Sequence, residues 1–222
     1  MKNIILIILT VTTLKTVGQN NFVGIIGGAN LTNATSVNFL TTTNKTGFCG
    51  GLTYEYLLKK HFSFGADIIY NQRGFNNDIV FTDKTGNPTG ITSTNQFNYD
   101  YISIPLKVGY NIGNKVYGFA NIGVSPSFLI DAKTKFPTID IDGNVNGSQT
   151  LNVTNNVTKF DLAGLVEIGG GYKFKDRYWL FTSFAYQQSF TTITNSDYFT
   201  NSTIKHYGLT FSVGLKYSVT KL

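Results

Sequence analysis

Cysteine is nearly absent from this sequence of 222 residues, which contains Cys49 alone. A single thiol can form neither an internal disulfide nor a cysteine metal site, so we expect Cys49 to be a small filler inside the fold. Charged residues are also scarce, at 14% of the chain, and no basic stripe is interleaved with aromatics despite a formal net charge of +6. These features predict no nucleic-acid partner.

Long apolar runs are missing after the first segment. Residues 4–14 form a short apolar run behind Lys2, and small residues at 16–18 provide a cleavage site before Gln19. This pattern is typical of an export signal, so residues 1–18 are predicted to be a signal peptide and residues 19–222 the mature domain. An exported chain without a helical span is either secreted, periplasmic or a closed membrane barrel.

The sequence does contain alternation with a period of two, most clearly between residues 101 and 110. One face of this stretch is apolar and comprises Ile102, Ile104, Leu106, Val108 and Tyr110. The other face is mostly small or charged and comprises Tyr101, Ser103, Pro105, Lys107 and Gly109. The length matches the roughly 9–11 residues that a tilted strand needs to cross a bilayer. We interpret the stretch as a membrane-spanning strand.

Comparable stretches recur along the chain, at 23–31, 46–58, 62–73, 101–110, 116–130, 157–174, 178–193 and 205–219. The connections between them are alternately long and short, which indicates one long-loop end and one short-turn end. The pattern predicts an all-β fold, an eight-stranded antiparallel up-and-down transmembrane β-barrel in a single domain. The register of the fifth stretch stays open, because Tyr117 and Phe119 compete with Val116, Ile122 and Val124 for the outer face.

Aromatic and basic residues near the ends of these stretches predict contacts with the membrane interface. An aromatic girdle near the short turns would comprise Tyr54, Tyr56, Phe62, Tyr110, Tyr172, Phe174, Trp179 and Tyr217. A second girdle near the long loops would comprise Phe48, Tyr70, Phe160, Phe190 and Tyr207. The short turns are expected to face the periplasm, with anionic lipid headgroups beside Lys59, Lys60, Lys115, Lys175, Arg177 and Lys221.

Several charged residues fall on the predicted inner face of the barrel. They are Glu55, Asp67, Arg73, Lys107, Asp161, Glu167, Lys173 and Lys216. An isolated ion away from water is very costly, so we expect these residues to form a structural network of pairs. Asp67 lies on the strand between those of Glu55 and Lys107, and Asp67 with Lys107 is the first pair that the order of strands predicts.

Three segments together resemble the PorT-like outer membrane β-barrel family of Gram-negative bacteria. The segments are Phe62-x-Phe64-x-x-Asp67-Ile68-Ile69-Tyr70-x-x-Arg73-Gly74, then Tyr101-Ile102-x-Ile104-Pro105-Leu106, then the glycine-rich stretch from Gly164 to Gly171. The resemblance covers nearly the whole mature chain. It implies a barrel in the outer membrane with no catalytic residues and, for some relatives, a link to protein secretion.

We therefore expect a monomeric protein of the cell outer membrane, without enzymatic activity, cofactor or bound metal. A conducting pore is not expected, because eight strands enclose a space that side chains fill. The long polar loops are predicted to carry the function, as an interaction surface for an envelope or extracellular protein. The alternative is a secretion-accessory barrel that works with other envelope proteins.

Other interpretations have specific residues behind them. A lipid-modifying barrel enzyme would need His206 with Ser189, Ser202 or Asp197 at the long-loop end. The acidic run at 140–144 has no closing glutamate for a calcium loop, so a β-turn is the better interpretation. A lipocalin-like binder would turn the apolar face inward around a ligand, but the other face is rich in Gly, Ser and Ala and lacks the dense charge of a solvated surface.

Overall fold

A computed structural model describes residues 19–36, 41–59, 61–82, 84–140, 145–175, 177–195 and 203–220. The predicted signal peptide at 1–18 lies outside these residues. So do Lys60, Lys221, Asp197, Ser202 and most of the acidic run at 140–144. Within the described part of the chain, no helix is long and apolar enough to cross a membrane.

The described residues form strands and one short 3-10 helix, η1 (Thr154–Asn156). The strands in the first half are β1 (Gln19–Ser36), β2 (Thr42–Thr43), β3 (Lys45–Leu58), β4 (Phe62–Thr82), β5 (Pro88–Ser103) and β6 (Leu106–Gly113). Those in the second half are β7 (Val116–Ile139), β8 (Val145–Asn152), β9 (Phe160–Phe174), β10 (Tyr178–Ser189) and β11 (Ile204–Ser218).

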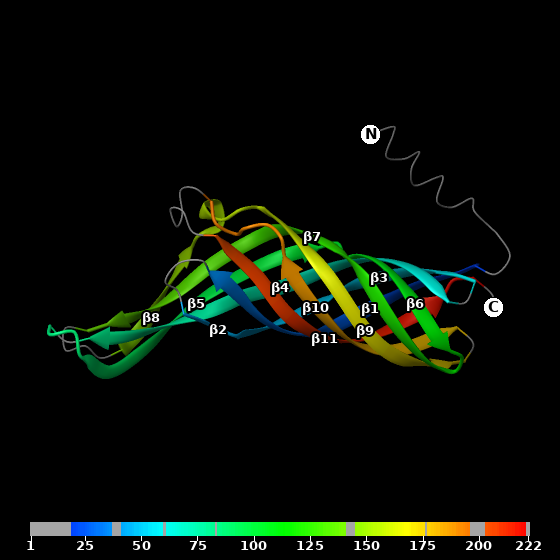
Figure 1. Cartoon of the computed structure of the whole chain (residues 1–222), viewed down its shortest axis with the longest axis horizontal. Coiled ribbons are helices and arrows are strands. Elements are labelled where there is room, and N and C mark those ends of the chain that lie inside the picture. Colours follow the sequence, from blue (N-terminus) through cyan, green and yellow to red (C-terminus); the bar gives the residue numbers. More distant parts are fainter. Residues whose placement is uncertain are drawn as a thin grey trace, which may run out of the picture.

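The sheet closes on itself (Figure 1). β1 pairs antiparallel with β3 on one side and with β11 on the other, and the ring continues through β10, β9 and β7. The circuit is completed by β4, which pairs with β5 and β6, and these two in turn pair with β7. Since β5 and β6 occupy one place in the wall, the described strands form a ring of eight positions.

The fourth wall strand is interrupted at Ile104 and Pro105, which lie between β5 and β6. Proline has no N–H to give to the ladder, so a break here is a physical consequence of the sequence. The remaining backbone groups still find partners across the gap. Asp67 N donates to Pro105 O at 3.0 Å, and Ile104 N donates to Pro126 O at 2.8 Å.

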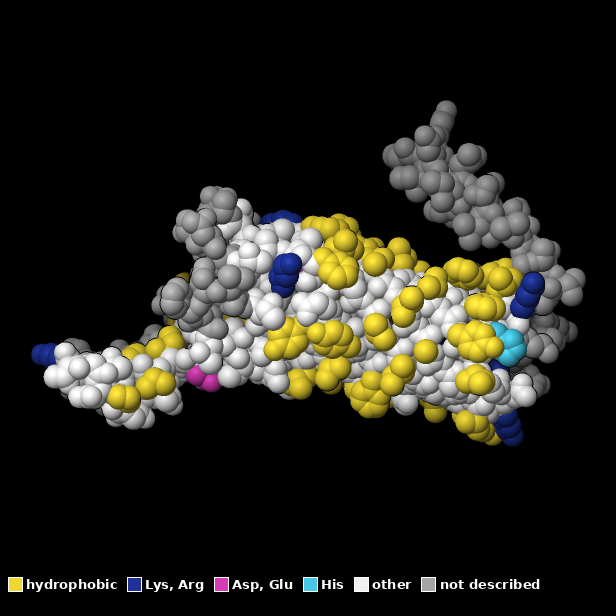
Figure 2. Space-filling view, in the orientation of Figure 1, with side chains coloured by type: hydrophobic (Ala, Val, Ile, Leu, Met, Phe, Trp, Pro, Cys, Tyr) yellow, Lys and Arg dark blue, Asp and Glu magenta, His cyan; other side chains and the backbone are white. Residues whose placement is uncertain are grey.

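The apolar face of the wall points outward, as the alternation predicted. Ile25, Leu52 and Ile68 are 61%, 60% and 57% exposed. Figure 2 shows apolar side chains spread over the wall, with lysines, arginines and a histidine near its ends. The lipocalin-like interpretation is therefore wrong, because it requires this face to be turned inward.

The register that the sequence left open is settled by burial. Val116, Ile122 and Val124 are exposed on the outer face, whereas Tyr117 and Phe119 are buried. The parity continues along β7 until a bulge opposite Asp100 and Tyr101 shifts the pairing with β5.

Trp179 was predicted to belong to the girdle near the short turns, and this prediction was wrong. Its side chain is 2% exposed and packs inside the barrel, with its ring centroid 4.3 Å from that of Phe22. The physical reason is parity, because Tyr178 is the residue of this pair that points outward. Exposed or half-buried side chains at Tyr54, Phe62, Tyr110, Tyr172 and Tyr217 keep the outward direction that the girdle requires.

Two of the predicted long loops are strands. β4 continues past the wall to Thr82 and pairs with the early part of β5, and β7 continues to Ile139 and pairs with β8. The two hairpins join where residues 96–98 of β5 pair with residues 133–135 of β7. A sheet of β4, β5, β7 and β8 thus projects from the end of the barrel opposite the short turns, at the left of Figure 1. We call this end of the barrel the long-strand end and the sheet the projecting sheet.

Candidate functional site

The barrel interior is built in three layers. Near the short turns lies an apolar cluster of Phe22, Ile26, Leu57, Tyr117, Phe119, Trp179 and Phe181. Near the long-strand end lies a second cluster of Ala34, Phe75, Phe97, Tyr99, Tyr101, Ala132, Val153, Val157, Ile193 and Ile204. Most of the inward charges predicted from the sequence occupy the space between these clusters, which we call the charged layer.

Lys107 is the centre of one half of the charged layer. Its Nζ lies 2.7 Å from Asp67 Oδ2 and 3.2 Å from Glu167 Oε2, so the cation joins β4, β6 and β9. Asn121 Nδ2 also donates to Glu167 Oε2, at 2.8 Å. The side chains of Asp67 and Glu167 are 2% and 5% exposed, and the two carboxylates share this one cation.

Glu55 is bridged by a different cation. Lys216 donates to Glu55 across the barrel interior, with both side chains about nine-tenths buried. Lys216 Nζ also lies 4.4 Å from the centre of the Phe181 ring. A lysine over an aromatic face gains further electrostatic stabilisation where water is excluded. Lys216 of the charged layer therefore contacts the apolar cluster near the short turns through the ring of Phe181.

Arg73 organises the other half of the charged layer, towards the long-strand end. Its Nη1 donates to Asp161 Oδ2 at 2.8 Å, and its Nη2 donates to Gln187 Oε1 at 2.9 Å and Ser127 Oγ at 3.1 Å. Asp161 also accepts from Ser189 at 2.9 Å and from Thr191 at 2.7 Å. The planar guanidinium, which carries five donors, suits such a set of acceptors better than an ammonium would.

Lys173 sits apart from these pairs, closer to the short turns. Its Nζ lies 3.8 Å from the centre of the Trp179 ring and 5.4 Å from that of Tyr117. With Lys173 included, the eight residues predicted from the sequence contribute four acids and four bases, so their formal charges cancel.

Little open space remains around the charged layer. A cavity of about 30 Å³ lies beside Asp67, Lys107 and Glu167, and another of about 10 Å³ lies beside Arg73, Ser189 and His206. Cavities of this size have room for one or two water molecules. In the described part of the chain, the interior thus resembles a packed polar core more than a channel.

The residues proposed for an enzyme do not form a nucleophile–base pair in the described part of the barrel. His206 is 2% exposed and packs against Tyr99, with ring centroids 5.1 Å apart, while Ser189 donates to Asp161. Ser202 and Asp197 lie outside the described residues. No group of three His, Cys, Asp or Glu residues that could hold a metal ion occurs among the residues that the structure describes.

Parity along the strands located all eight charged residues, but it did not name the neutral groups that complete the site. Asn121 was missed because the register of its strand was open. Ser127, Gln187 and Thr191 were missed because hydroxyl and amide side chains are common on both faces of such strands.

Solved structures with the same fold are outer membrane proteins. The structure is similar to OprG from Pseudomonas aeruginosa, with 12% sequence identity, 90% of this chain and 95% of that chain covered, and a TM-score of 0.52. It is also similar to the outer membrane protease OmpT from Escherichia coli, with 13% identity, 93% and 99% covered, and a TM-score of 0.50. At these identities the likeness shows the fold alone. No curated protein sequence matches the chain.

A closed antiparallel ring with an apolar outside and a charged, packed inside defines a β-barrel protein of the outer membrane. The family model described as outer membrane protein beta-barrel domain matches residues 17–195. The chain belongs to this family and is localised in the outer membrane.

Proposed function

We propose that this protein is a barrel without a conducting pore that binds a protein partner through its projecting sheet. The absence of a pore is supported by the two apolar clusters and by the paired charges between them. The projecting sheet is supported as the interaction surface by one observation above all, the free edge of β8. No nucleic acid, cofactor or metal takes part in this proposal.

β8 is an edge strand with little of the usual protection, since a register shift opposite Thr138 and Ile139 is its one irregularity. It pairs with β7 on one side, and no described strand pairs with its other side. All eight residues, from Val145 to Asn152, are exposed, and the strand contains no charged residue and no proline. Natural sheets normally guard such edges with lysine, proline or a bulge, because unpaired N–H and C=O groups template another strand. An extended peptide added to this edge would satisfy those groups.

The β4–β5 hairpin beside it is protected in the expected ways. Its tip carries Pro88, the exposed Lys84 and a register shift between Val80 and Thr82. Gly90 adopts a φ of 79°, which distorts the strand further. The β7–β8 hairpin also has a register shift, between Thr138 and Ile139, but β8 contains neither a proline nor a lysine, and this difference favours β8 as the edge that binds.

The root of the projecting sheet is held firmly on the barrel. Phe75 and Phe97 stack with centroids 4.6 Å apart over the long-strand end. Phe75 also packs towards His206 of β11, with ring centroids 6.3 Å apart, so the root contacts a wall strand that is not its neighbour. A rigid root presents the edge of β8 in one orientation, which lowers the ordering cost of binding.

The test is photo-crosslinking from the edge itself. The purified full chain, carrying a photoreactive residue at Gln149, is incubated with a detergent extract of the cell envelope. We expect a crosslinked partner that is lost in the Ser148→Lys/Thr150→Lys variant, because lysines on an edge oppose strand addition. The matched control, Thr82→Lys/Thr92→Lys on the β4–β5 hairpin, should retain the partner.

A second, finer proposal follows from the resemblance to PorT-like barrels, which suggests a secretion-accessory role with envelope proteins. It is supported by the wall segments at 62–74 and 101–106, which carry the resemblance. It is also compatible with the predicted position of cations at the short turns, such as Lys59 and Lys115, against anionic lipid headgroups. Trimming residues 85–95 and 138–152 separates the two proposals. If every partner stays bound to the trimmed barrel, the partner contacts the wall or the short turns, and the accessory role is favoured.

A further inference from the structure

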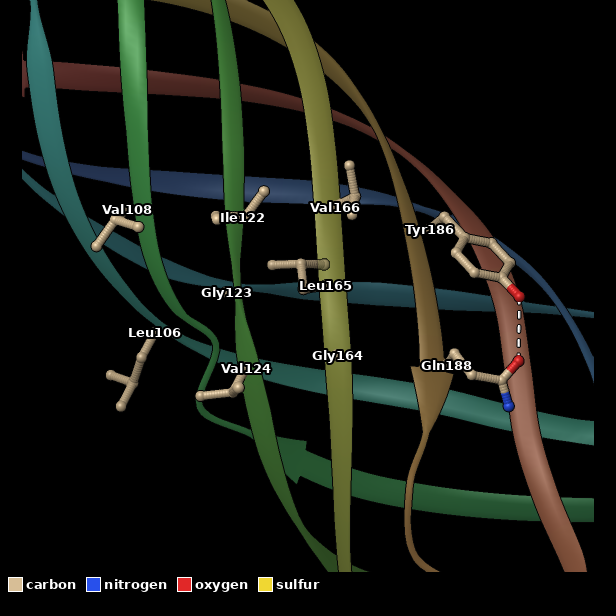
Figure 3. A pocket seen from close by; sticks show the side chains of 10 residues that line it. All are labelled: Leu106, Val108, Ile122, Gly123, Val124, Gly164, Leu165, Val166, Tyr186 and Gln188. Atoms are coloured by element: carbon tan, nitrogen blue, oxygen red, sulfur yellow. Dashed lines mark hydrogen bonds between the residues drawn. The ribbon is translucent and has the colours of Figure 1, made fainter.

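The free edge of β8 lies outside the membrane wall. Within the described ring each wall strand pairs on both sides, and the outer face is apolar. Figure 3 shows part of that face, where Ile122 and Val166 lie side by side on β7 and β9. β8 instead pairs with the far end of β7 and leaves its other side open. A strand that adds to this edge must therefore come from outside the bilayer.

The direction of β8 decides how a second copy of the chain could pair with it. β8 is antiparallel to β7, with Val145 beside Ile139 and Asn152 beside Lys133, so it runs back towards the barrel. In Figure 1 the projecting sheet extends away from the barrel along the length of the molecule. Two copies in one membrane would present parallel β8 strands, whereas copies in two facing membranes would present antiparallel ones. Antiparallel pairing is slightly more stable per residue, and a two-fold axis makes both sides of such a contact identical.

The sequence of β8 is complementary to itself in one antiparallel register. With Gln149 opposite Gln149 of the second copy, Ser148 faces Thr150 and Gly147 faces Leu151 on both sides of the two-fold axis. Paired residues then have the same parity, so each face of the sheet continues across the contact. Hydroxyl pairs across strands stabilise a sheet. The Leu151 side chain, which is 44% exposed, would lie beside a residue that has no side chain.

The charges near β8 also favour a second copy. β8 has no charged residue, so two of these strands meet without repulsion. The exposed cations Lys133 and Lys135 lie one strand further in, on β7. In the paired sheet the β7 strands of the two copies are three strand spacings apart, about 14 Å, which exceeds the Debye length of roughly 8 Å at physiological salt. The surface charge that normally prevents edge-to-edge pairing is therefore missing here.

Resting on the proposed function of the β8 edge, we propose that its partner is a second copy of this chain in a facing membrane. The two β8 strands pair antiparallel about Gln149 and join the two projecting sheets into one. Each barrel remains single within its own membrane. The edge thereby holds together two membranes that both carry this protein.

The experiment reconstitutes the purified full chain in two populations of phosphatidylcholine vesicles that carry different fluorescent lipids. We expect mixed-colour clusters and a severalfold rise in light scattering with no other protein present. Vesicles with Ser148→Lys/Thr150→Lys alone, or with Ser148→Glu/Thr150→Glu alone, should stay apart, because like charges then face each other. Mixing these two variants should restore the clusters, which also shows that both are folded. The matched control, Thr82→Lys/Thr92→Lys on the β4–β5 hairpin, should cluster like the parent chain.

Cysteine pairs test the register and the direction together. Ser148→Cys in one vesicle population and Thr150→Cys in the other should form a disulfide between populations under mild oxidation. Either variant by itself should form severalfold less, whereas Gln149→Cys should pair with itself. The native Cys49 is buried and should not interfere.

The outcomes separate this inference from the proposed function. If parent vesicles stay apart while a photoreactive residue at Gln149 still crosslinks a different envelope protein, the second copy is the wrong partner and β8 remains the binding edge. Clusters that survive the lysine variant would assign the contact to another surface and overturn the inference. Disulfides between copies in the same vesicle, without clusters, would mean pairing within one membrane and would also overturn it. Loss of both the clusters and the envelope crosslink would reject the proposed function as well.

Discussion

Lys107 forms its ion pair with Asp67 beside the break between β5 and β6, where a wall strand is interrupted. The two residues lie on β6 and β4, and Asp67 also donates its backbone N–H to Pro105 O at the break. The charged contact thus adds a side-chain link between β4 and β6 beside the point where the backbone ladder is irregular. This position makes Lys107 the most informative residue of the charged layer to change.

Lys107→Met should destabilise the barrel by roughly 3–5 kcal/mol, because it leaves buried carboxylates without their cation. Asp67→Asn combined with Lys107→Met should recover part of the loss, since Asn121 still donates to Glu167. Urea unfolding in detergent, followed by the fluorescence of the single tryptophan, measures both. Lys115→Met, at an exposed turn, is the control and should change stability little. Unchanged stability in Lys107→Met, together with a lost activity, would mean that the network serves function and not structure.

Arg73 offers a test of geometry apart from charge. Arg73→Lys keeps the positive charge near Asp161 but loses the fork that also reaches Ser127 and Gln187. We expect it to cost about 1–3 kcal/mol, the typical penalty of leaving a buried polar group unsatisfied, and Arg73→Met to cost more. The same urea titrations rank the two variants. Equal stability of Arg73→Lys and the parent chain would show that charge alone matters at this position.

The direction of nearly every wall residue could be predicted from the sequence, because a barrel in a bilayer must alternate apolar and small or polar side chains. The alternation of apolar and polar residues fades beyond Gly74 and Ala132, because the outward positions there, such as Asn76, Asp78 and Lys133, are polar. The projecting sheet therefore looked like loop. The sequence also could not predict which charged residues form ion pairs across the barrel interior. Strand order brings Asp67 beside Lys107, but only the stagger of the closed ring places Lys216 against Glu55 and Arg73 against Asp161.

The packed interior predicts how the protein behaves in a planar bilayer. The apolar clusters around Phe22 and Phe75 lie on either side of the charged layer, and eight strands leave little width for anything besides side chains. We expect no sustained ohmic channels of porin size. Stable openings with conductance proportional to voltage would contradict the proposed sealing.

Orientation in the membrane can be tested by cysteine labelling of intact cells with an impermeant maleimide. Thr85→Cys at the tip of the β4–β5 hairpin and Thr150→Cys on β8 should react, whereas Asn114→Cys in the turn between β6 and β7 should not. The sequence also predicts an accessible cysteine at Asn144, outside the described residues. The native Cys49 is buried and should stay silent. Reaction at Asn114 alone would reverse the predicted topology.

The continuity of β7 has a mechanical consequence. This strand runs from Val116 at the short turns to Ile139 in the projecting sheet without a break, a contour of roughly 80 Å at about 3.3 Å per residue. A pull on the partner proposed to bind β8 would be passed along β7 into the membrane wall, where hydrogen bonds to β5, β6 and β9 would share the tension in shear. The barrel would then anchor the projecting sheet through many backbone hydrogen bonds that are loaded together. β7 connects that sheet to the wall as one continuous strand.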